Sequence, residues 1–87
     1  MKMSQADFEA FKKRQKKERI LLELDARETS FPVELANITE STTEEIEQLL
    51  SDLVSKKLVE RVVGRYYKLT YEGHRWAEEL SREKKAL

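Results

Sequence analysis

Charged side chains are the groups best suited to carry function in this chain, and they gather in separate stretches. The 87 residues hold 17 Lys and Arg against 17 Asp and Glu, so the formal net charge is zero. Residues 12–19 contain six basic and one acidic residue, residues 20–54 contain nine acidic and one basic, and residues 55–87 contain nine basic and five acidic. This basic, acidic, basic order points to charged binding surfaces.

The composition gives little support to catalytic or metal-binding chemistry. The chain has no cysteine and one histidine, His74, so it offers neither a thiolate nucleophile nor an imidazole cluster for a metal ion. It also lacks a Gly-rich phosphate loop. We therefore predict no enzyme activity, no metal and no cofactor, and we interpret His74 as a surface residue of a helix.

The sequence shows no sign of a membrane segment or an export signal. No apolar run approaches the roughly 20 residues of a membrane span, and residues 1–4 lack the apolar stretch of a signal peptide. The absence of cysteine fits a reducing compartment, so we expect a cytoplasmic protein. The high content of Glu and Lys resembles that of heat-adapted proteins, many of them archaeal.

One long helix is expected near the N-terminus. No Gly or Pro interrupts residues 4–27, and most of them are good helix formers. The second half of this helix carries an apolar patch for the core, made of Ile20, Leu21 and Leu24. The first half cannot bury itself on the same core, so residues 1–18 either fray or dimerise.

Two further helices are expected in the middle of the chain. Pro32 suits the first turn of a helix over residues 32–38, because its missing N–H is not needed there. A third helix begins after Ser41, where a capping box is predicted: the Ser41 hydroxyl accepts from the Glu44 N–H, and the Glu44 carboxylate accepts from the Ser41 N–H. Apolar residues at helical spacing predict one buried stripe on this third helix: Ile46, Leu49, Leu50 and Leu53. Its opposite face is polar and acidic.

A β-hairpin and a last helix complete the pattern. Two runs rich in β-branched and aromatic residues flank Gly64-Arg65, a pair that suits a two-residue type II′ turn. This register places Arg61 opposite Lys68. It turns four apolar residues toward the core: Leu58, Val62, Tyr67 and Leu69. Thr70 is then expected to cap the last helix.

These elements predict a single domain over residues 1–87 that is mainly α with a small β-hairpin. Their order is that of a winged helix-turn-helix with an extended N-terminal helix and a C-terminal helix. We divide it into a helical extension over residues 1–18, the helix-turn-helix with its wing over residues 19–71, and the C-terminal helix over residues 72–87. So small a domain is marginally stable alone, which favours a second subunit.

Two segments resemble the winged-helix transcription regulators of the MarR, PadR and ArsR type, which are common in bacteria and archaea. Residues 53–61, Leu-Val-Ser-Lys-Lys-Leu-Val-Glu-Arg, are similar to the family's entry into the wing. Residues 67–73, Tyr-Lys-Leu-Thr-Tyr-Glu-Gly, are similar to its strand ending in Leu-Thr-x-x-Gly. Lys57 stands where the family usually has a glycine. The resemblance implies a DNA-binding transcription regulator.

In that family the start of the third helix enters the major groove of double-stranded DNA, with the wing beside it. The resemblance therefore implies a DNA-binding site from both elements: Thr42, Thr43, Glu44, Glu47, Gln48, Arg61, Arg65 and Lys68. Glutamine suits adenine, and a carboxylate can accept from cytosine. The glutamates are repelled by phosphate, whereas a phosphate would relieve the like-charged pair of Arg61 and Lys68.

The acidic third helix leaves a second function open. Its face, with Glu44, Glu47 and Gln48, would dock a basic protein if this winged helix is a protein-interaction module. A DNA-binding regulator with a basic wing is thus the first prediction, and binding of a basic partner is the alternative. We expect a homodimer through the terminal helices, with an interface at Phe8, Phe11, Trp76 and Leu80.

Overall fold

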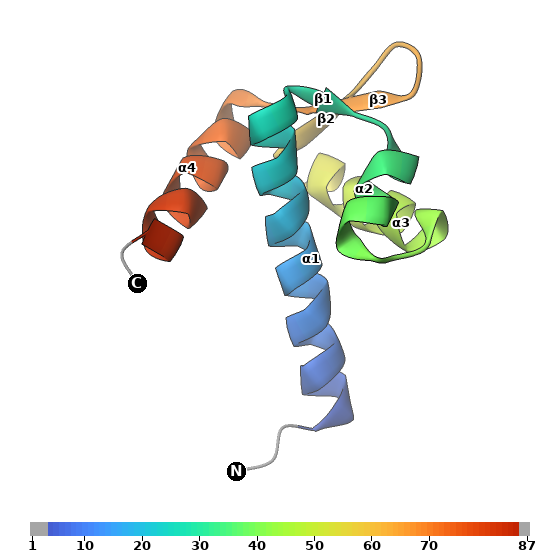
Figure 1. Ribbon diagram of the computed structural model, residues 1–87, viewed down its shortest axis with the longest axis vertical. Helices are drawn as coiled ribbons and strands as arrows, with labels where there is room; N and C mark the ends of the chain where they lie inside the picture. The colour runs from blue at the N-terminus through green and yellow to red at the C-terminus, as the bar shows by residue number, and fades with distance from the viewer. Residues whose placement is uncertain (1–3, 86–87) are drawn as a thin grey trace.

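The computed structural model describes residues 4–85, which form helices around a small antiparallel sheet (Figure 1). The elements are α1 (Gln5–Arg27), β1 (Thr29–Ser30), α2 (Pro32–Thr39), α3 (Thr43–Ser55), β2 (Val59–Val62), β3 (Tyr66–Leu69) and α4 (Tyr71–Lys85). This order confirms the predicted fold class, a mainly helical winged helix-turn-helix.

The long helix α1 supports the rest of the fold. Helix α4 packs along one side of α1, and the pair of α2 and α3 packs on the other (Figure 1). The apolar patch predicted on α1 and the stripe predicted on α3 are both buried. They are joined in the core by Leu35, Ala36, Leu58, Val59, Leu69, Ala77 and Leu80. The first half of α1 extends past the rest of the molecule (Figure 1).

The start of α3 differs from the predicted capping box. Thr42 is the N-cap residue, and its hydroxyl accepts a hydrogen bond from the backbone N–H of Glu45 at 3.1 Å. Ser41 belongs instead to the turn after α2, where its hydroxyl donates to the carbonyl oxygen of Thr39 at 3.2 Å. The capping prediction was wrong by one residue because this turn already holds Ser41. The Glu44 side chain is exposed.

The hairpin has a three-residue loop in place of the predicted two-residue turn. Val62 pairs with Tyr66, which leaves Val63, Gly64 and Arg65 in the loop. Gly64 and Arg65 both have positive φ, at 90° and 70°. The register of the strands is therefore shifted by one residue from the prediction, and a shift of one turns a strand's side chains to the opposite face.

This shift explains Glu60, which the predicted register would turn toward the core. Glu60 pairs instead with Lys68 on the outer face, where its Oε1 lies 3.1 Å from the Lys68 Nζ. Val59 takes the inner face and is 1% exposed. The predicted like-charge pair is therefore wrong, since Arg61 lies opposite Tyr67 and not opposite Lys68. Burying valine and pairing opposite charges both favour the observed register.

A third strand, β1, was not predicted. Thr29 and Ser30 pair antiparallel with β3, so the strand order in the sheet is β1-β3-β2. Ser30 is 1% exposed, and its hydroxyl donates to the Glu34 carboxylate at 3.3 Å. Two residues are too few to show alternation in a sequence. The strand ties the end of α1 to the wing.

Lys57 follows the C-cap residue of α3 and adopts a left-handed backbone conformation, with φ at 63°. Its N–H donates to the carbonyl oxygen of Val54 at 2.9 Å, and the N–H of Leu58 donates to that of Leu53 at 3.0 Å. These two bonds form a Schellman motif, in which glycine is favoured because a β-carbon is strained at this φ. Lys57 thus adopts the backbone that suits the family's usual glycine.

Replacing Lys57 with glycine is expected to stabilise the domain by about 1 kcal/mol, because the strain of the β-carbon disappears. Thermal unfolding followed by circular dichroism should then show a midpoint roughly 4–8 °C higher. Lys56, with φ at −85°, supplies the matched control, and Lys56→Gly should lower the midpoint. A lower midpoint for Lys57→Gly would contradict the assignment of strain.

Candidate nucleic-acid interface

The exposed face of α3 lies opposite its buried stripe, as helical geometry requires. Glu44, Gln48 and Ser51 form the outermost row of this face, and all three are exposed. Thr43 and Glu47 lie on the side of α3 that faces the wing, and they too are exposed. Thr42, which was also predicted to meet DNA, has a structural role as the N-cap residue of α3.

The wing and α3 form a groove between them. Thr43 and Glu47 line this groove from α3, and Arg61, Arg65 and Tyr67 line it from the hairpin. Both arginines are exposed. The structure therefore brings four of the predicted site residues to one groove, with two basic groups beside an acidic one.

The wing is held in place beside α2. The ring of Tyr66 lies over that of Phe31, with 4.1 Å between their centroids and 33° between their planes. Such aromatic contacts stabilise a hairpin that would be marginal alone. The contact fixes the base of the loop that carries Arg65.

The other side of α3 is bordered by the basic part of α1. The Lys16 Nζ lies 2.9 Å from the Glu45 Oε2, and the Lys17 Nζ lies 3.3 Å from the Asp52 Oδ2. Two of the acids on α3 are therefore matched within the chain. Local sequence patterns do not predict these pairs, because the partners are far apart in the chain, 29 positions in the case of Lys16 and Glu45.

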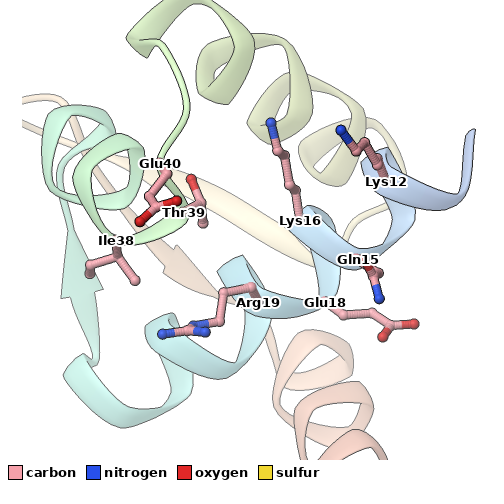
Figure 2. A pocket seen from close by; sticks show the side chains of 8 residues that line it. All are labelled: Lys12, Gln15, Lys16, Glu18, Arg19, Ile38, Thr39 and Glu40. Atoms are coloured by element: carbon pink, nitrogen blue, oxygen red, sulfur yellow. The ribbon is translucent and has the colours of Figure 1, made fainter. Parts of the chain in front are cut away.

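Lysines of α1 also lie beside Gln48. Lys12, Lys13 and Lys16 line a shallow hollow together with Gln48 and Glu45. Lys12 and Lys16 project from the same side of α1 (Figure 2). Helix α3 is thus flanked by basic side chains on both sides, from α1 on one and from the wing on the other.

Lys68 does not lie on either of the two basic surfaces beside α3, the one on α1 and the one on the wing. It lies on the opposite face of the hairpin from Arg61, next to Thr29 of β1, and it is paired with Glu60. A residue paired in this way has less charge to offer a phosphate. The predicted basic patch on the wing is therefore reduced to Arg61 and Arg65.

A wider hollow lies between α1 and the turn that follows α2 (Figure 2). Its charged groups are largely engaged. The Arg19 Nε is 3.1 Å from a Glu23 carboxylate oxygen, and Lys16 pairs with Glu45. The Thr39 hydroxyl donates to a backbone carbonyl at 2.8 Å. We assign no ligand to this hollow.

The residues predicted for a dimer interface divide into two groups. Phe8, Phe11 and Trp76 are 48%, 46% and 54% exposed. Leu80 is 7% exposed and belongs to the core of its own chain. Leu80 was therefore wrongly predicted as an interface residue, because α4 packs on α1 of its own chain and buries this side chain. His74 is exposed, as predicted, with its Nδ1 2.9 Å from an Asp25 oxygen on α1.

Within the described part of the chain, no three His, Cys, Asp or Glu side chains are grouped so that they could hold a metal ion. None of the helices in residues 4–85 combines the length and the apolar character needed to span a membrane.

Comparison with known proteins gives matches at the level of structure. No family profile matches the sequence, and no curated protein matches it. Ligand-free NadR has a TM-score of 0.75 and 30% identity, over 82% of this chain and 54% of its own. ZitR of Lactococcus lactis has a TM-score of 0.74 and 20% identity, over 82% of this chain and 50% of its own. Reduced MarR of E. coli has a TM-score of 0.59 and 24% identity, over 94% of this chain and 73% of its own.

These structures are MarR-family winged-helix transcription regulators. The present chain spans about half of the length of NadR. The chain therefore has the winged-helix fold of these regulators, and it is similar to the MarR family in the part of their length that it spans.

Proposed function

We propose that this protein is a DNA-binding transcription regulator in which α3 enters the major groove and the wing contacts the phosphate backbone. One observation carries the proposal: α3 lies between two basic borders, Arg61 and Arg65 on the wing and Lys12 and Lys13 on α1. A helix in the major groove has a phosphate strand on each side. Basic groups on both sides of the helix suit that geometry.

The acidity of α3 is a smaller obstacle to this function than the sequence implies. Glu45 and Asp52 are matched by lysines of α1. Glu44 and Glu47 remain on the face that would meet base edges. There a carboxylate can accept a hydrogen bond from the N4 amino group of cytosine, while Gln48 can pair with adenine. Phosphate contacts would supply affinity, and these three side chains would supply sequence preference.

The regulator is proposed to act as a homodimer through its terminal helices. Two copies related by a twofold axis would present two α3 helices to half-sites about one DNA turn apart, roughly 34–36 Å. Selection from a random duplex library tests both parts of the function. Enriched sequences with an inverted repeat would support it, and a selection that enriches nothing over many rounds would count against a sequence-specific regulator.

Replacing both Glu44 and Glu47 with lysine is expected to strengthen binding to mixed-sequence DNA by about tenfold or more near physiological salt, because two repulsive groups become attractive. The same variant should lose preference for the selected sequence, because the carboxylates no longer read bases. Competition titrations with selected and scrambled duplexes measure both effects. Weaker binding to mixed-sequence DNA would contradict a role of this face against DNA.

A second function is favoured by one observation. Glu44 and Glu47 are exposed, and no ion pair holds either of them within residues 4–83. A basic protein could therefore dock on this face. The lysine variant described above distinguishes the two functions, since it would abolish binding of a basic protein while strengthening binding of DNA.

A further inference from the structure

Glu34, in the first turn of α2, makes more contacts than the capping of a helix requires. Its Oε1 accepts a hydrogen bond from the backbone N–H of Phe31 at 3.2 Å, as a glutamate at this position of a helix commonly does. The same oxygen accepts from the hydroxyl of Ser30 at 3.3 Å. Ser30 is 1% exposed, so the carboxylate supplies an acceptor to a hydroxyl that water does not reach.

The other carboxylate oxygen of Glu34 faces α1. The Arg27 Nη1 lies 3.5 Å from the Glu34 Oε2, and the Arg27 Nε lies 3.3 Å from a carboxylate oxygen of Glu23. The second oxygen of Glu23 lies 3.1 Å from the Arg19 Nε. Alternating charges therefore connect the second half of α1 to Glu34 and orient its carboxylate.

Ser30 lies in one register row with the wing residue Arg61. Ser30 of β1 pairs with Tyr67 of β3, and Tyr67 pairs on its other side with Arg61 of β2. The strand order β1-β3-β2 places β3 between the other two. A displacement of Ser30 therefore moves the strand with which Arg61 is paired.

Phe31 connects Glu34 to the other wing arginine. The ring of Phe31 packs on that of Tyr66, with 4.1 Å between their centroids. Tyr66 directly follows Arg65 in the chain. Because Glu34 holds the backbone N–H of Phe31, it also holds the residue on which the base of the wing loop rests.

Glu34 itself lies outside the surface proposed for DNA. The groove beside α3 is lined by the three residues that precede Glu34 in the chain, Phe31, Pro32 and Val33. The Glu34 carboxylate contacts β1 and α1 instead. An effect of this residue on DNA binding would therefore act through the position of the wing.

We propose that Glu34 is a positioning residue for DNA binding: its carboxylate holds Ser30 and Phe31, and through them it fixes the wing beside α3. This inference rests on the proposed function and deepens it, because it names the group that orders the wing before DNA is bound. A wing that is ordered in the free protein avoids an ordering cost on binding.

Replacing Glu34 with alanine is expected to weaken binding to mixed-sequence duplex DNA by about tenfold, because both hydrogen bonds are lost and the wing must be ordered on binding. Removing a negative charge would by itself strengthen binding, so net charge cannot cause this loss. Glu34→Gln keeps an acceptor oxygen for Ser30 and Phe31, and it should bind within about twofold of the wild type.

The matched control is Glu40→Ala, which removes the same charge from the exposed C-cap position of the same helix. It should not weaken DNA binding. Fluorescence anisotropy measures all four proteins at a temperature at which circular dichroism shows each of them folded. An unchanged DNA affinity of Glu34→Ala would overturn the proposal, as would an equal loss in the control.

A double-mutant cycle separates positioning from a general loss of stability. In a protein with Arg61→Gln and Arg65→Gln the wing has no charge to place, so Glu34→Ala should have little further effect on DNA binding. An equal loss in both backgrounds would overturn the proposal, because it would show that Glu34 does not act through the wing arginines.

Amide hydrogen exchange of the free protein tests the position of the wing without DNA. Glu34→Ala should accelerate exchange in residues 60–68 by at least about fivefold more than in α3, because the wing is loosened locally. A uniform acceleration over both regions would indicate lower global stability and would overturn the proposal.

The two experiments distinguish a failure of this inference from a failure of the proposed function. A wild-type protein that binds no DNA would overturn the proposed function and the role of Glu34 in it, while exchange would still show whether Glu34 orders the wing. A protein that binds DNA, with neither affinity nor exchange dependent on Glu34, would overturn this inference alone.

Discussion

Reversing the charge of both wing arginines, with Arg61→Glu and Arg65→Glu, is expected to weaken binding to duplex DNA by at least about 100-fold near physiological salt. The substitution removes about two phosphate contacts and places a repulsive carboxylate at each of them. Both side chains line the groove beside Glu47, so the substitution leaves that border of α3 entirely acidic. Fluorescence anisotropy with a labelled duplex measures the loss.

The control must match the change in net charge. Arg75→Glu with Arg82→Glu makes the same change on α4, at exposed positions outside the groove beside α3. This control should weaken DNA binding by only a few fold, because it changes only the long-range electrostatic field of the protein. Lys68→Gln should also have a small effect, since Lys68 is paired with Glu60 on the other face of the hairpin. Equal losses in all three variants would contradict the assigned wing surface.

Replacing Gly73 with alanine is expected to destabilise the domain by about 3 kcal/mol or more, near the upper end of the cost of overpacking. Gly73 is buried in the first turn of α4, where a β-carbon would overlap the backbone carbonyl oxygen of Leu58 and would lie 3.1 Å from the Leu69 Cδ2. Backbone in this position cannot move aside cheaply. The Leu58 carbonyl oxygen also accepts a hydrogen bond from the N–H of Thr70 at 3.1 Å.

Urea unfolding monitored by circular dichroism measures this cost. Glu72→Ala in the same turn is the control, because Glu72 is exposed and its removal should change the free energy of unfolding by less than about 0.5 kcal/mol. A Gly73→Ala protein that fails to fold would agree with the expectation. A free energy of unfolding within about 1 kcal/mol of the wild-type value would contradict the close packing of α4 on the wing.

Two hydrogen bonds of Thr70 give the Leu-Thr-x-x-Gly segment its physical basis. The Thr70 Oγ1 accepts from the N–H of Gly73 at 3.1 Å, which caps α4 as predicted. The same hydroxyl donates to the carbonyl oxygen of Lys57 at 2.6 Å. Thr70 therefore joins the start of α4 to the end of α3, and Gly73 lets the two backbones approach.

Elements with strong periodicity were predictable from the sequence. The buried stripe of α3 spans two turns, and only a helix places such residues on one face. The hairpin register changes when the loop is three residues long and not two, and the sequence contains no pattern that distinguishes the two lengths. Arg65 adopts a positive φ that residues other than glycine rarely take, so a two-residue turn at Gly64 was the simpler expectation.

The candidate site was predictable only in part, because some of its contacts depend on how distant elements pack together. Helix geometry placed Glu44 and Gln48 on the exposed face of α3 correctly. The match between Lys16 and Glu45 depends on how α1 crosses α3, which local sequence patterns do not contain. Without that match, α3 has the charge of a poor DNA ligand. With it and the pair of Lys17 and Asp52, two of the four acidic residues on α3 are matched from within the chain.

A titration of the wild-type protein into mixed-sequence duplex DNA, at several salt concentrations between about 50 and 200 mM, tests DNA binding most directly. Besides Lys16 and Lys17, which are paired with acids of α3, four basic side chains per chain flank this helix: Lys12, Lys13, Arg61 and Arg65. If they contact phosphates, the logarithm of the binding constant should fall with the logarithm of the salt concentration with a slope of about −3 to −4 per chain. The absence of binding at the lowest salt would contradict the account and turn the search to protein partners of α3.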